Sequence, residues 1–119
     1  MSEPEPRILS TPLSEAERRT LAESNFGDMF KFVVDVVRGV VAVGGEFHAD
    51  GEALLLDAGS RQADVWGAND YPDRVVGDRI EYAAMINVYP VRGNRRQEIE
   101  SPGTRASVQA LVIQWIGPA

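Results

Sequence analysis

The chain has 119 residues, with 18 acidic and 12 basic side chains and a net charge of -6 at neutral pH. This length suits a single domain with one core, and a content of 44% hydrophobic and 25% charged residues is that of a globular protein rather than a disordered one. The negative charge disfavours non-specific binding to nucleic acid, and the lack of cysteine excludes disulfides, thiolate metal sites and cysteine nucleophiles.

Residues 1–12 contain three prolines and alternating acids, a composition typical of a flexible or docked tail. This start lacks the basic segment and apolar core of a signal peptide, and no apolar run approaches the roughly 18 residues needed to span a membrane. We therefore expect a cytoplasmic protein whose single domain occupies residues 13–119.

The first helix is predicted over residues 15–24. Ser14 is a favourable N-cap, and Glu17 stands three residues later, where it completes a capping box.

A β-hairpin is predicted over residues 29–43, where apolar side chains recur at every second position. We expect a two-residue turn at Arg38 and Gly39, which would pair Val34 with Val43 and keep the apolar side chains on one face.

A second helix is predicted over residues 51–58, with Asp50 as its cap and Gly59 at its end. A strand over the same residues is the weaker alternative, because β-branched residues are absent there.

Two strands follow, over residues 64–70 and 79–89, and the second ends before Pro90. The last element is a helix over residues 104–116 with Thr104 as its cap. This order predicts an α+β fold in which three helices cover one face of a mostly antiparallel sheet.

The only histidine of the chain lies in the sequence GGEFHAD. If this segment is extended, the alternate residues Glu46, His48 and Asp50 project to the same side, where they would form a catalytic site or bind a divalent metal. The interpretation we favour is structural: Asp50 caps a helix, Glu46 is solvated and His48 hydrogen-bonds the bend.

A second group of polar residues surrounds a tryptophan in the segment 59–70. Trp66 would either form the floor of a binding pocket or anchor a strand in the core, and we favour the core. The candidate ligand-binding residues of this segment are Arg61, Gln62, Asp64, Trp66 and Asn69.

The segment RGNRR, residues 92–96, is the one dense basic run of the chain. Such a cluster either binds phosphate or carboxylate groups, or neutralises acidic residues of this chain or of a partner. No phosphate-binding loop, dinucleotide motif or hydrolase motif accompanies it.

Several of these motifs together resemble a family of short prokaryotic proteins, the domain of unknown function numbered 5674. The resemblance covers about residues 13–116 and is carried by FGDM (26–29), GGEFHAD (44–50), GSRQ followed by DVWG, Asn87 and GNR (93–95). It implies a shared fold and transfers no catalytic residue. The matching polar residues Asn87, Asn94 and Arg95 complete the candidate ligand-binding set.

Two functional hypotheses follow from these observations. The first, which we favour from the sequence, is a non-catalytic interaction or regulatory module that forms a homo-oligomer or binds a protein partner. The second is a protein that binds a small molecule or divalent metal, or a hydrolase, with a site around His48 and Arg61 or Arg95. A pocket that joins these residues would favour the second hypothesis.

Overall fold

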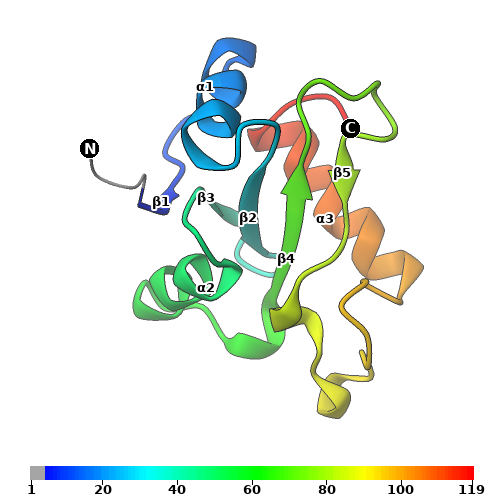
Figure 1. Cartoon of the computed structure of the whole chain (residues 1–119). Helices are drawn as coiled ribbons and strands as arrows, with labels where there is room; N and C mark the ends of the chain where they lie inside the picture. The colour runs from blue at the N-terminus through cyan, green and yellow to red at the C-terminus, as the bar shows by residue number, and fades with distance from the viewer. Residues whose placement is uncertain (1–4) are drawn as a thin grey trace.

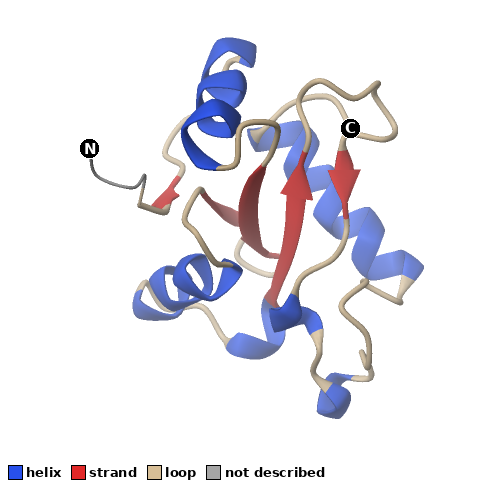
Figure 2. Cartoon of the chain, viewed as in Figure 1, coloured by secondary structure: helices blue, strands red, loops and turns tan. Residues whose placement is uncertain are grey.

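The computed structural model describes residues 5–119. Three α-helices and five strands occur in this part of the chain, together with three 3₁₀ helices, η1 to η3 (Figures 1 and 2). The elements are β1 (Arg7–Ile8), α1 (Glu15–Asn25), β2 (Phe30–Asp35), β3 (Val40–Val43), α2 (His48–Asp57), η1 (Gln62–Asp64), β4 (Val65–Asp70), β5 (Ile80–Glu81), η2 (Met85–Asn87), η3 (Pro90–Arg92) and α3 (Pro102–Trp115). No helix in residues 5–119 is long and apolar enough to cross a membrane.

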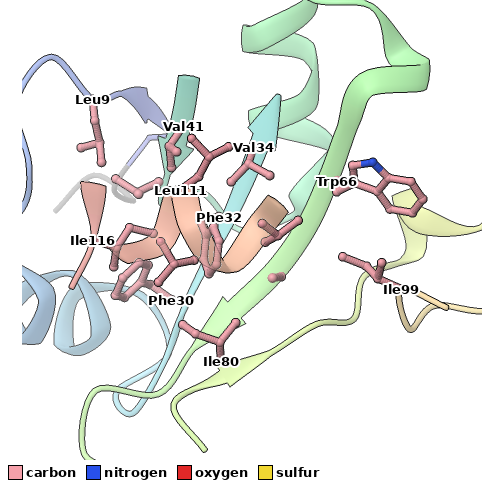
Figure 3. Packing of buried hydrophobic residues seen from close by; sticks show 14 of the residues in the cluster. Leu9, Phe30, Phe32, Val34, Val41, Trp66, Ile80, Ile99, Leu111 and Ile116 are labelled. Carbon is pink, nitrogen blue, oxygen red and sulfur yellow. The ribbon is translucent and has the colours of Figure 1, made fainter. Parts of the chain in front are cut away.

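The five strands form one antiparallel sheet in the order β1-β3-β2-β4-β5, so the predicted α+β class is confirmed. We expected the helices to cover one face of the sheet, but they cover both faces. Phe30, Phe32 and Val34 pack with α1 and α3, whereas Val33 packs with Leu55 of α2 on the opposite face. Figure 1 shows α3 behind the sheet, and Figure 3 shows the larger of the two cores. Strand β2 is therefore covered on both sides, which explains its nearly continuous apolar sequence.

The predicted hairpin is confirmed, but its register differs by two residues. Val34 pairs with Val41 instead of Val43, and the loop spans residues 36–39. The cause is Asp35, whose Oδ1 accepts hydrogen bonds from the backbone N–H groups of Val37 and Arg38, both at 2.9 Å. A shift of two residues leaves every side chain on its expected face.

The helix α2 begins at His48, three residues earlier than predicted, and Asp50 is not its N-cap. Phe47 occupies that position, and the Asp50 carboxylate reaches back to the backbone N–H of Phe47 at 3.2 Å. Gly51 of this helix lies against β2. A Cβ atom there would stand 2.8 Å from Val33 Cγ2, so the missing side chain permits this close approach.

The caps of the other two helices differ in how well they were predicted. Ser14 and Glu17 form the expected capping box of α1. In α3 the N-cap is Ser101 instead of Thr104: the Ser101 hydroxyl accepts from the Thr104 N–H, and Pro102 fills the first helical position.

The predicted strand over 79–89 is wrong beyond Glu81, where β5 ends. The chain turns into η2 instead, and the buried side chain of Asn87 takes the place of a pairing strand. Its Oδ1 accepts from Gly67 N–H at 2.8 Å, and its Nδ2 donates to the Gly67 carbonyl at 2.9 Å. A side-chain amide thus satisfies the backbone of β4 and frees residues 83–88 from the sheet.

The fold also includes part of the segment assigned to an N-terminal tail. Arg7 and Ile8 pair with Val43 and Ala42 of β3, and Leu9 is buried in the larger core. The portion of that segment in residues 1–4 lies outside the described residues.

Candidate functional site: a cleft at the start of α2

An open cleft of about 720 Å³ lies where the first turn of α2 faces the end of the sheet. Its lining comes from α2, the strands β2, β4 and β5, and the two segments that follow β5. Gly67 explains how these parts come together. A Cβ atom at this position of β4 would stand 2.7 Å from Ala84 Cβ and 3.1 Å from His48 Cδ2. The bare backbone of Gly67 therefore lets both walls reach the strand.

The floor of the cleft is a row of polar side chains on three neighbouring strands. Lys31 of β2 is paired with Asn69 of β4, and Asn69 is paired with Glu81 of β5. The Asn69 Nδ2 donates a 2.8 Å hydrogen bond to Glu81 Oε1 and a longer one, 3.3 Å, to the carbonyl of Ala83. The register of the sheet thus places one ammonium, one amide and one carboxylate in line.

His48 lies above the middle of this row. Its Nε2 is 3.0 Å from the carbonyl oxygen of Ala68 and 2.8 Å from Asn69 Oδ1. A carbonyl oxygen only accepts, so Nε2 must carry the proton. The contacts of Asn69 agree, because its Nδ2 faces two acceptors and its Oδ1 therefore faces the imidazole.

The second ring nitrogen of His48, Nδ1, has a different environment. The ring edge that carries Cδ2 lies against Gly67, so the opposite edge, with Nδ1, faces away from β4. Among the described residues, Nδ1 has no hydrogen-bond partner and is not among the buried unpaired atoms. In the neutral ring it is an acceptor without a partner among these residues, on a side chain that lines the cleft.

The imidazole is held in its neutral form. Burial lowers the pKa of His48 below its ordinary value of 6.5, and the nearby positive charge of Lys31 acts in the same direction. The hydrogen bonds to Ala68 and Asn69 and the charge of Glu81 oppose this shift only in part. At neutral pH the Nδ1 lone pair is therefore available to accept a hydrogen bond or a proton.

Lys31, the only lysine of the chain, supplies the positive charge of the cleft. Its Nζ donates a 2.9 Å hydrogen bond to the carbonyl of Glu46 and lies 5.0 and 5.5 Å from the ring centroids of Phe26 and Phe47. One of the three ammonium donors is used by Glu46, which leaves donors for a ligand.

Apolar side chains border the cleft on both sides. Phe47, at the start of α2, is 58% exposed, and Met85 of η2 is 69% exposed. Ala49 and Ile86 complete the two walls. The cleft thus has a polar floor and apolar sides, as small-molecule sites usually do.

Comparison with known proteins places the chain in a family without an assigned activity. Residues 7–115 match the family described as "Protein of unknown function (DUF5674)". The chain belongs to this family. This match confirms the resemblance carried by the sequence motifs. No curated protein and no solved structure matches the chain.

The segment GGEFHAD does not form the metal site that we considered. His48 and Asp50 lie in the first turn of a helix, so the three side chains do not project from one extended segment. Glu46 and Asp50 are exposed, and His48 uses Nε2 to bind β4. Within residues 5–119, no three His, Cys, Asp or Glu side chains are grouped so as to hold a metal ion.

The polar residues around Trp66 lie apart from the cleft, except for Asn69. Arg61 and Gln62 are exposed, and Asp64 is half-buried; Gln62 and Asp64 lie in η1. Trp66 is only 7% exposed and belongs to the core, as we favoured.

The first arginine of the basic run, Arg92, serves as internal support. The guanidinium of Arg92 lies 3.5 Å from the ring centroid of Trp66 and donates to the carbonyls of Gln62, Ala63 and Val65. Arg95 is exposed and does not line the cleft. The cleft that His48 lines therefore includes neither Arg61 nor Arg95.

Asn87 and Asn94, which were candidates for ligand binding, are buried and bind the backbone. Asn94 Nδ2 donates to the carbonyls of Asn87, Arg96 and Glu98, and its Oδ1 accepts from the N–H of Glu100. Together the two amides hold the segments that form the wall of the cleft opposite α2.

Of the residues that line the cleft, only His48 and Asn69 were selected from the sequence; those missed include Lys31, Glu81 and Met85. Lys31 had one available signal, since it is the only lysine and interrupts an apolar strand. Its position beside Asn69 depends on the pairing of β2 with β4, which are far apart in sequence.

Proposed function

We propose that this DUF5674 domain binds a small organic molecule in the cleft at the start of α2. The observation that carries the proposal is the combination of a polar row, Lys31, Asn69 and Glu81, with a neutral imidazole, that of His48, that lines the same cleft. A volume of about 720 Å³ lies within the range of roughly 300–1,000 Å³ typical of ligand sites.

The hydrogen-bonding positions that remain unused in the cleft also support the binding of a ligand. Asn69 uses both of its N–H donors and also its oxygen, and it holds His48 and Glu81 in place. Lys31, His48 and Glu81 keep unused donor or acceptor positions. In a preorganised binding site we expect this arrangement, in which one residue, Asn69, is fixed by hydrogen bonds within the protein and its neighbours keep hydrogen-bonding positions for the ligand.

The interaction-module hypothesis has support at a different place. Val75 and Val76, in the loop between β4 and β5, are 71% and 57% exposed. Adjacent exposed valines favour contact with another apolar surface, and a second copy of the chain is the simplest partner. We keep self-association as a separate proposal, independent of the cleft.

A fragment screen followed by two-dimensional ¹H–¹⁵N NMR tests the binding proposal. We expect the binding fragments to shift the amide signals of Ala49, Asn69 and the segment 83–86. Replacement of Ala49 by tryptophan places a large side chain in the cleft and should abolish these shifts.

The matched control is Ala53→Trp. Ala53 is also exposed and lies on the same helix one turn later, but it does not line the cleft. Binding that survives Ala53→Trp and is lost in Ala49→Trp supports the proposal. Fragments that bind elsewhere, or that bind both variants equally well, would contradict it.

A further inference from the structure

We infer that the ligand of this cleft is a small amino-acid-like zwitterion with an apolar side chain, its carboxylate facing Lys31 and its ammonium facing Glu81. This inference rests on the proposed function and specifies the class of molecule that the site selects. It follows from the order of charges along the floor of the cleft and from the apolar sides.

The charges of the cleft are separated by sign. Lys31 stands on the β2 side, whereas Glu81 of β5 and Glu98 stand on the other side. Glu98 is bridged to Ala83, two residues beyond Glu81, so the two carboxylates lie in the same region. An anion alone would meet these carboxylates, and a cation alone would meet the ammonium. A molecule with one group of each sign satisfies both ends.

The spacing fits a molecule of amino-acid size. Lys31 and Glu81 are separated by one strand, so their backbones lie about 10 Å apart at ordinary strand spacing. Asn69 fills the floor between them, and both side chains line the same open cleft, where a ligand above Asn69 can present a carboxylate to one and an ammonium to the other. His48 lines the same cleft, and its unprotonated Nδ1 is a further acceptor for a donor group of the ligand.

The apolar part of the ligand has a place between the walls. Phe47 and Met85 are largely exposed although both line the cleft, and Ile86 lies beside Met85. Aromatic and thioether side chains pack well against a hydrocarbon or phenyl group. L-Phenylalanine is therefore a suitable probe.

The test compares three molecules that share the phenyl group: L-phenylalanine, 3-phenylpropanoate, which lacks the ammonium, and 2-phenylethylamine, which lacks the carboxylate. NMR titration of the unmodified protein should give L-phenylalanine the lowest Kd, by about tenfold against each truncated molecule, the scale of one charge-assisted hydrogen bond. The shifts should map to Ala49, Asn69 and Glu81.

Two variants assign the charges. Lys31→Met should remove the preference over 2-phenylethylamine, and Glu81→Gln should remove the preference over 3-phenylpropanoate. Arg61→Met and Glu23→Gln, which change the same charges at exposed positions outside the cleft, should leave both preferences intact.

The outcomes separate this inference from the proposed function. Equal Kd values for the three molecules, with shifts confined to the cleft, would overturn the zwitterion and leave the binding site standing. Tightest binding of either truncated molecule would do the same. If none of the three binds, the inference is overturned, and the fragment screen decides the proposed function on its own evidence.

Discussion

Replacement of Asn87 by alanine should destabilise the protein more than its single side chain suggests. Asn87 is fully buried and satisfies both the N–H and the carbonyl of Gly67, at 2.8 and 2.9 Å. Alanine leaves two buried backbone groups without partners, at a cost of about 1–3 kcal/mol each, or about 2–6 kcal/mol together. That is a large fraction of the roughly 5–15 kcal/mol that stabilises a domain.

Urea unfolding followed by circular dichroism measures this loss. The matched control is Asn25→Ala, because Asn25 makes one hydrogen bond, to the Leu21 carbonyl, and is only partly buried. We expect the control to lose about 0.5–1.5 kcal/mol. If Asn87→Ala costs no more than Asn25→Ala, the side chain of Asn87 does not replace a pairing strand, and our account of the chain after β5 is wrong.

Three further predictions concern packing, pH and assembly. Gly51→Ala should lower the urea midpoint despite the better helix propensity of alanine, and should cost less in a Val33→Ala background, where the 2.8 Å contact is relieved. Burial lowers the pKa of His48 below 6.5 in the folded protein, so the neutral imidazole contributes its full stabilisation above pH 6.5. This stabilisation declines as the pH falls from 6.5 towards the folded pKa. The urea midpoint of His48→Gln should therefore decline less than that of the wild type between pH 7.5 and about pH 5. Sedimentation velocity at micromolar concentration should show a species heavier than the 13.0 kDa chain, and a Val75→Ser, Val76→Ser double variant should reduce it; a single 13.0 kDa species in the wild type would count against self-association.

The sequence predicts local structure well where the local chemistry is sufficient. The capping box of α1 needs only Ser14 and Glu17, and the alternating pattern of β2 assigns Phe30 and Phe32 to one face. The hairpin register was wrong because it is decided by the side chain of Asp35, which binds two N–H groups of the turn. Such a bond competes with the commoner two-residue turn and leaves no trace in the apolar pattern.

The end of β5 was missed for a related reason. Residues 79–89 alternate as a strand does, but Asn87 uses its side chain to bind Gly67, twenty residues earlier in the chain. The pattern reports which side chains are buried; it does not report whether the backbone or a side chain makes the hydrogen bonds.

The candidate site was predicted only in part. His48 was selected from the sequence as the only histidine and Asn69 as one of the polar residues around Trp66, and both line the cleft. Glu81 and Lys31 join them only through the pairing of three strands, and Arg61 and Arg95 lie elsewhere. A site assembled across a sheet becomes visible when the strand order is known.

The most direct test of the binding site is a crystal structure of the protein soaked with the fragments that shift the cleft signals. We predict density between Phe47 and Met85, with polar ligand atoms within hydrogen-bond distance of Lys31 Nζ and His48 Nδ1. Density that lies only at other surfaces, or Phe47 and Met85 closed over the polar floor in the presence of fragment, would contradict a binding site at the start of α2.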